Sequence, residues 1–406
     1  MVKPGLVVLV VSYVAFVSIG LPDTVLGVAW PSLRATFGIP PSAMGAVLAS
    51  GMGGYFLSGL GAGNAVRKFG VGGLLTLSSA LVAMALFGYA LAPTWTVFFP
   101  IGAVWGVGSG AIDAALNGYA ARHFSVRHVN WLHACWGIGA SIGPAVMTFF
   151  IASGFGYRIG YALLGTVLGS MAVLFFGTRR RWDDTPSPSS TSPATPAVDD
   201  DHHRASPPSA KPVTLGRTLC SGLVWLQALL FLLYTGVEST VGQWCFSWLR
   251  EQRGLAVEAA GSWTSAYWAS LTVGRIVLGS FIGRVGPDRM LRLATLSSVV
   301  GIVSFVSVGG LLGRLGLLLL GASLAPMFPT LMARTPDRIG DDLAHHAVGL
   351  QVSAGTLGSA LGPSAVGFLV AQSGIGAFGK FAVAVAIALL LMHELLLAMT
   401  RRARTV

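Results

Sequence analysis

Three carboxylates have the residue type and setting for chemistry: Asp23 in LPDTVLG, Asp113 in AIDAALN and Glu238 in GVESTVG. Each lies inside a long apolar stretch, where an unpaired charge is costly. Acidic residues in such places face a protein interior or a wet cavity and often carry protons. We therefore predict that all three take part in proton coupling.

The composition indicates a membrane protein. The chain has 406 residues, of which 53% are hydrophobic and only 10% are charged, well outside the usage of soluble domains. Its net charge of +11 is scattered in short clusters between apolar runs, unlike the basic patch of a nucleic-acid-binding domain. We expect a lipid bilayer as its surroundings and no nucleic acid partner.

The apolar runs predict an all-α protein with twelve transmembrane helices, because one span needs about 20 apolar residues. Most basic loop residues fall on one side when both termini are cytoplasmic, as the positive-inside rule requires. The expected spans are 6–31, 42–66, 72–92, 95–121, 130–153, 156–178, 218–249, 259–283, 289–311, 314–334, 344–371 and 375–399.

One segment differs in composition from the rest. Residues 179–217 are rich in Pro, Ser, Thr and Asp and have no apolar face to bury, so they predict a flexible cytoplasmic linker. The linker divides the chain into an N-terminal six-helix bundle, 1–178, and a C-terminal six-helix bundle, 218–406. Its acidic and histidine run is interpreted as solvated charge, and no metal site is assigned.

The two bundles repeat one another in sequence. GLPDTVLGVAW near Asp23 resembles GVESTVGQW near Glu238, and GIGASIGP resembles GTLGSALGP. Glycines four residues apart favour close helix packing. Internal repeats of this kind are typical of alternating-access transporters, in which Asp23 and Glu238 would be pseudo-equivalent.

The most specific stretch is GSGAIDAALNGYAARHFSVRHVNWLHACWGIGASIGP. It resembles the fucose:proton symporter family, within the major facilitator superfamily, in the acid four residues before an Asn and in the later Gly and Pro. The basic residue stands three positions before the next Asn instead of two. The loops GAGNAVRKFGVGGLL and GSFIGRVGPDRML also resemble the superfamily's loop motif, with Asn64 and Gly283 near the usual acid.

This resemblance implies the major facilitator fold and a proton-driven sugar importer. It implies that Asp23 and Asp113 are the two membrane acids that link protonation to substrate binding. Glu238 departs from the family, where a neutral amide is expected, and adds a third titratable group. A sodium gradient remains an alternative driving force.

Several polar and aromatic residues are candidates for substrate binding. Asn117 lies four residues after Asp113 and shares its helix face, and an amide suits a sugar hydroxyl. The other candidates are His133, Trp136, Gln243, Trp244 and Gln351. Arg275 is expected to reach toward the cytoplasmic surface and anchor a loop, and His393 and Glu394 are interpreted as structural.

These features predict a monomeric proton-coupled symporter of a sugar or similar small polar solute in a bacterial-type inner membrane, without a cofactor. A proton-coupled antiporter that exports a drug or metabolite is the alternative, because the same residues serve both directions. An enzyme is disfavoured, since no metal-ligand cluster or nucleophile motif is evident. The three cysteines lack paired spacing and are read as buried hydrophobes.

Overall fold

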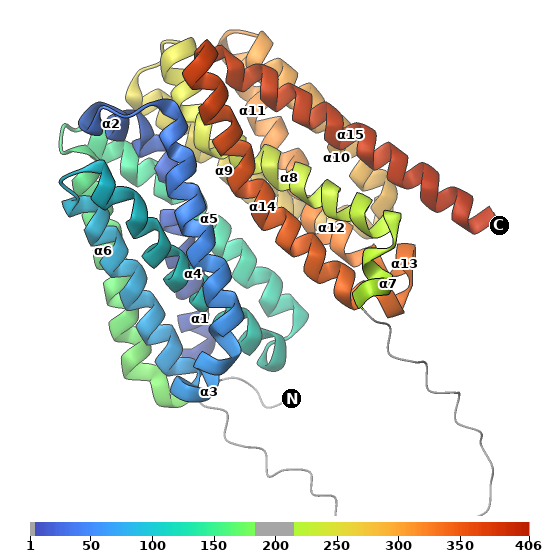
Figure 1. The fold of residues 1–406 in the computed structure, drawn as a ribbon, viewed down its shortest axis with the longest axis horizontal. Coiled ribbons are helices and arrows are strands. Elements are labelled where there is room, and N and C mark those ends of the chain that lie inside the picture. The colour runs from blue at the N-terminus through green and yellow to red at the C-terminus, as the bar shows by residue number, and fades with distance from the viewer. Residues whose placement is uncertain (1–4, 183–214, 406) are drawn as a thin grey trace, which may run out of the picture.

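The computed structural model describes residues 5–182 and 215–405, so most of the predicted linker, 183–214, lies outside the described residues. The described chain is built from helices (Figure 1). In order they are α1 (Leu6–Asp23), α2 (Leu26–Phe37), η1 (Pro41–Ala43), α3 (Met44–Leu91), α4 (Trp95–His123), α5 (Val126–Ala152), α6 (Gly156–Thr178), η2 (Arg179–Arg181), α7 (Leu215–Leu219), α8 (Gly222–Ser247), η3 (Trp248–Gln252), α9 (Val257–Val285), α10 (Pro287–Ser307), α11 (Gly310–Leu324), α12 (Met327–Ala333), α13 (Thr335–Ile339), α14 (Asp341–Ser373) and α15 (Gly376–Thr405).

The helices account for the membrane spans expected from the sequence. Among the described residues, ten stretches are long and apolar enough to cross a membrane. One of them, Pro41–Leu91, contains Gly70 with φ 69° and ψ 169°, a backbone conformation that favours glycine and divides α3 into two spans. Helix α9 is less apolar but has 29 residues. The all-α membrane fold is thus confirmed.

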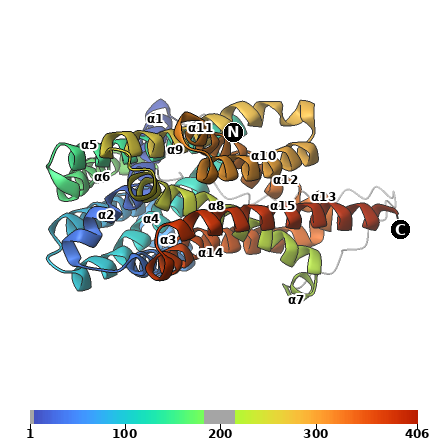
Figure 2. The same ribbon diagram turned by 90° about the horizontal axis from the view of Figure 1, so that it is seen from above.

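The helices form two groups that lie side by side (Figure 1). We call residues 6–182 the N-terminal half and residues 215–405 the C-terminal half. Figure 2 shows the same two groups from above. The end of each group where α6 ends and α7 begins is here the linker side, and the opposite end is the far side.

Glycines bring the first and fifth helices of each half into close contact. The two glycines that stand four residues apart in each repeated motif meet a carbonyl of the partner helix, where an added Cβ would overlap it: Gly139 meets Val17, Gly143 meets Leu21, Gly358 meets Leu232 and Gly362 meets Gly236. The packing role predicted for these motifs is confirmed, because only a residue without a side chain allows so close an approach.

The same contacts place Asp23 and Glu238 at matching positions in the two halves. Asp23 is two residues beyond Leu21, and Glu238 is two residues beyond Gly236. Each half also has a hydroxyl bond between these helices, from Thr24 to the Ala140 carbonyl at 2.8 Å and from Thr235 to the Gly355 carbonyl at 2.6 Å, but the two bonds lie at different positions relative to the acids. By the glycine contacts, the two acids are equivalent in helix packing as well as in sequence.

The two halves meet closely at the far side. Arg34 lies 3.6 Å from Glu251 across the interface, and a Cβ at Gly27 or Gly367 would overlap the opposite half. Helix α14 leans away from α3 toward the linker side (Figure 1). The molecule is thus in a conformation in which the far side of the interface is closed.

Candidate functional site

Asp23 is the last residue of α1, immediately before the chain breaks its helix and continues into α2. Its Oδ2 accepts a hydrogen bond of 2.8 Å from Trp136 Nε1 on α5. Gly20 allows this contact, because a Cβ there would overlap the carbonyl of Trp136. The close packing of α1 on α5 thereby positions an indole donor beside the carboxylate.

Asp113 lies in the middle of α4 and accepts two hydrogen bonds. Asn117 Nδ2 donates to Oδ1 at 2.8 Å, and Tyr55 Oη from α3 donates to Oδ2 at 2.7 Å. The predicted shared face of Asp113 and Asn117 is confirmed, as expected for residues four apart on a helix. Both donors are neutral groups.

Glu238 is buried in α8 and has different partners. Tyr234, one turn earlier, donates a hydrogen bond to Glu238 Oε2, and Arg275 Nη2 on α9 lies 3.6 Å from the same oxygen. Tyr267 Oη donates to the Glu238 carbonyl at 3.0 Å. A cation and two tyrosines thus hold this acid and its backbone.

The expectation for Arg275 was wrong. Its side chain does not extend to the cytoplasmic surface but turns inward to Glu238, with only 24% of it exposed. A cation inside a span needs a carboxylate partner or a route to water, and here the partner is on the neighbouring helix.

Trp136 connects the two halves between Asp23 and the Glu238 and Arg275 pair. The Arg275 guanidinium carbon lies 5.6 Å from the centre of the Trp136 ring, and Trp268 packs edge-on against the same ring at 6.4 Å. We call Asp23, Trp136, Arg275 and Glu238 the central cluster. It runs from the N-terminal acid through an indole to the C-terminal ion pair.

The electrostatic settings of the acids differ. In the described part of the chain, no Lys, Arg or His nitrogen lies within 4.0 Å of the carboxylates of Asp23 or Asp113. Glu238 has Arg275 within that distance. A carboxylate out of water without a cation favours its protonated form, whereas a nearby cation favours the charged form.

The other candidate residues make no hydrogen bond to the three carboxylates in the described structure. His133 is exposed and packs edge-on against Phe16 at 5.6 Å. Gln243 and Trp244 are buried in α8, and the Trp244 indole donates to the Pro363 carbonyl at 3.0 Å. Gln351 is fully buried and donates to Thr335 at 2.9 Å. Trp244 and Gln351 thus serve the packing of the C-terminal half, whereas the backbone of Gln243 lies against Gly27 of the N-terminal half.

Sequence reasoning passed over several residues of the site. Tyr234 stands four residues before Glu238, a helical spacing that could have revealed it. Tyr55 reaches Asp113, Tyr267 reaches the Glu238 carbonyl and Trp268 reaches Trp136, each from another helix, and their sequence surroundings carry no distinguishing signal. Only the packing of α3 and α9 brings them to the site.

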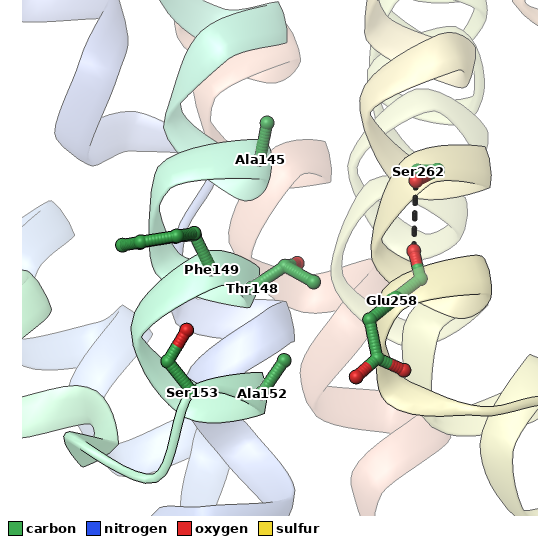
Figure 3. Close-up of a pocket in the computed structure, with 7 residues that line it drawn as sticks. All are labelled: Ala145, Thr148, Phe149, Ala152, Ser153, Glu258 and Ser262. Carbon is green, nitrogen blue, oxygen red and sulfur yellow. Dashed lines mark hydrogen bonds between the residues drawn. The ribbon is translucent and has the colours of Figure 1, made fainter.

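A surface pocket lies elsewhere, between α5 and α9 (Figure 3). It is lined by Thr148 and other α5 residues on one side and by Glu258 and Ser262 on the other. Thr148 is twelve residues beyond Trp136 in α5, which is about 18 Å along a helix. This pocket is therefore separate from the central cluster. In the described residues, no group of three or more His, Cys, Asp or Glu could hold a metal ion.

Comparison with known proteins identifies the family. Residues 12–363 match the Major Facilitator Superfamily. The chain belongs to this superfamily of secondary transporters and is a multi-pass membrane protein, not an enzyme.

Its relatives are distant. The chain is 25% identical over 389 residues to "Bypass of stop codon protein 6" of Saccharomyces cerevisiae, covering 89% of this chain and 76% of that protein. Among solved structures it resembles a variant of the nucleoside transporter NupG, with a TM-score of 0.75, 14% identity and coverage of 97% of this chain and 100% of that chain. It also resembles a variant of the E. coli fucose:proton symporter FucP, with a TM-score of 0.59, 15% identity and coverage of 97% and 99%. These structural likenesses concern the fold.

Proposed function

We propose that the protein is a proton-coupled symporter that moves a sugar or a similar small polar solute by alternating access. The observation that carries this proposal is that Asp23 and Asp113 accept hydrogen bonds from neutral donors, without a basic partner in the described structure. Removing a carboxylate from water without a cation is costly, and binding a proton removes that cost.

Glu238 has a different role in this proposal. Its Oε2 lies 3.6 Å from Arg275 Nη2, and the carboxylate fixes the orientation of the guanidinium. Asp23 and Asp113 carry the proton, and Glu238 belongs to an ion pair. This narrows the three predicted coupling residues to two, both in the N-terminal half.

Asn117, His133 and Trp136 are the proposed substrate contacts. Asn117 offers an amide that both donates and accepts, His133 is exposed, and the indole of Trp136 provides an aromatic face. The nucleoside transporter and the fucose:proton symporter that share this fold are named for hydroxyl-bearing solutes, which supports this class of substrate. Gln243, Trp244 and Gln351 are not proposed as contacts, because they are buried in the C-terminal half.

The transport cycle follows from the interface between the halves. Closing the far side, as seen here, directs the site toward the linker side, and the reverse rocking would direct it outward. Asp23 and Asp113 are half-buried here, and protonation neutralises both, which lowers the cost of enclosing them when the protein passes through an occluded state. A membrane with a proton gradient, such as a bacterial inner membrane, is the setting that this mechanism requires.

Proton-coupled antiport of a drug or metabolite is a second candidate. It is favoured by the half-buried indole of Trp136 beside Asp23, whose aromatic face suits a flat apolar solute. Antiport would drive solute out against an inward proton gradient, whereas symport would accumulate it.

The test is uptake of labelled monosaccharides and nucleosides into proteoliposomes under an imposed inward proton gradient. The wild type should accumulate one solute class, and Asp113→Asn should abolish accumulation. Glu258→Gln is the matched control, since this carboxylate is exposed at the distant surface pocket, and it should transport like the wild type. A folded protein that accumulates none of these solutes would contradict the symport proposal, and proton-driven extrusion would establish antiport.

A further inference from the structure

Trp136 is placed so that a single side chain touches both halves and both kinds of charge. Its Nε1 donates to Asp23 at 2.8 Å within the N-terminal half. The guanidinium carbon of Arg275 lies 5.6 Å from the centre of the Trp136 ring, and the ring centre of Trp268 lies 6.4 Å away. Both of these residues belong to the C-terminal half. This indole is therefore a direct physical link between the N-terminal acid and the opposite half.

The two contacts of the indole depend on one another. An N–H group that donates to an ionised carboxylate is polarised, and hydrogen-bonded groups strengthen one another in a medium of low dielectric constant. The extra electron density on the ring then strengthens its attraction for a cation above its face. A neutral Asp23 polarises the indole less and so weakens the contact between Trp136 and Arg275.

Arg275 is suited to sense this change because its position is fixed from the other side. Glu238 lies 3.6 Å from its Nη2, and Tyr234 in turn donates to Glu238. The guanidinium is thus held against the indole by its own half. A change in the strength of the contact with Trp136 then acts on the interface between the halves.

We propose that Trp136 is a positioning residue that transmits the charge state of Asp23 to the interface between the halves. Ionised Asp23 stabilises the closed far side seen here, and neutral Asp23 loosens it. The proposal rests on the proposed function only in that Asp23 gains and loses a proton during transport.

Other titratable or charged groups surround these residues and must be kept constant in a test. They are Tyr55 on α3, Asp113 on α4, His133 on α5, Tyr234 and Glu238 on α8, and Tyr267 and Arg275 on α9. Replacing Asp23 by Asn at constant pH mimics protonation at one position. The wild type and the Asp23→Asn variant are then compared at one pH, so the neighbouring groups are not titrated.

The experiment is a double-mutant cycle read by spin-label distances in nanodiscs without substrate. Labels at Thr36 and Gln252, both exposed beside the Arg34 and Glu251 pair, report closure of the far side in a protein whose Cys135, Cys220 and Cys245 are replaced. Asp23→Asn should lower the ratio of closed to open molecules about fivefold, the size expected for one weakened cation–π contact. In a Trp136→Phe background, which keeps the ring but loses the N–H donor, Asp23→Asn should have no further effect.

Trp268→Phe is the matched control. Its indole packs at the same interface, but its Nε1 has no hydrogen-bond partner in the described structure, so the effect of Asp23→Asn should persist there. Arg275→Lys is a second variant, for the case that Trp136→Phe fails to fold. It keeps the charge beside Glu238, loses the planar guanidinium, and should reduce the effect of Asp23→Asn.

Two results would overturn the proposal: an Asp23→Asn effect of full size without the Trp136 donor, or no effect of Asp23→Asn in the otherwise unchanged protein. Since the measurement uses neither substrate nor gradient, its outcome is independent of the uptake assay. Failure of sugar transport would leave this result unaffected.

Discussion

Asp23 and Glu238 occupy equivalent positions in the two halves but have different partners. Asp23 accepts a hydrogen bond from the Trp136 indole, whereas Glu238 lies beside Arg275 and accepts from Tyr234. The glycine contacts that set both positions are the same. The comparison teaches that the repeat fixes where an acid lies, and that its neighbours decide whether it has a cation beside it; in the proposed function this separates a proton carrier from a member of an ion pair.

The largest effect is expected from removing Arg275, the cation that distinguishes the setting of Glu238 from that of Asp23. Arg275→Met should lower the free energy of unfolding by about 3–5 kcal/mol, because it leaves Glu238 buried without a charge partner. Adding Glu238→Gln should restore most of the loss. Thermal or denaturant unfolding in detergent measures both effects, and a double variant as unstable as the single one would contradict the ion-pair interpretation.

A smaller effect is expected from the glycine contacts that the two halves have in common. Gly139→Ala and Gly358→Ala should each cost about 1–3 kcal/mol of stability, since each added methyl group would meet a carbonyl of the neighbouring helix. Gly118→Ala on α4 is the control, because nothing lies within 4 Å of its Cβ position, and it should be neutral or slightly stabilising. Unequal costs at Gly139 and Gly358 would mean that the two halves do not pack alike.

Much of the fold could be predicted from the sequence because membrane spans depend on local composition. Runs of apolar residues mark the helices, and the repeated glycine motifs indicate which helices pack closely. The break after Asp23 that separates α1 from α2 was not predicted, since the whole stretch is apolar enough for one span. Residues 183–214 of the predicted linker lie outside the described structure.

The site was only partly predictable for a physical reason. Asp23, Asp113 and Glu238 stand out because a charge in a membrane is costly, and Asn117 follows from helical spacing. The same rule singled out Arg275, but sequence does not show whether a long side chain turns inward or toward water. The contacts of Tyr55 and Trp268 depend on packing between distant segments, which no local pattern indicates.

The most direct test of the different roles of the acids is infrared difference spectroscopy of the purified protein between neutral and acidic pH. A protonated carboxyl group gives its own C=O band, so the groups that take up protons can be observed without substrate. Asp23→Asn and Asp113→Asn should each reduce this band, and Glu238→Gln should leave it unchanged. A band that persists in both N-terminal variants and disappears in Glu238→Gln would contradict the assignment of the proton to the N-terminal half.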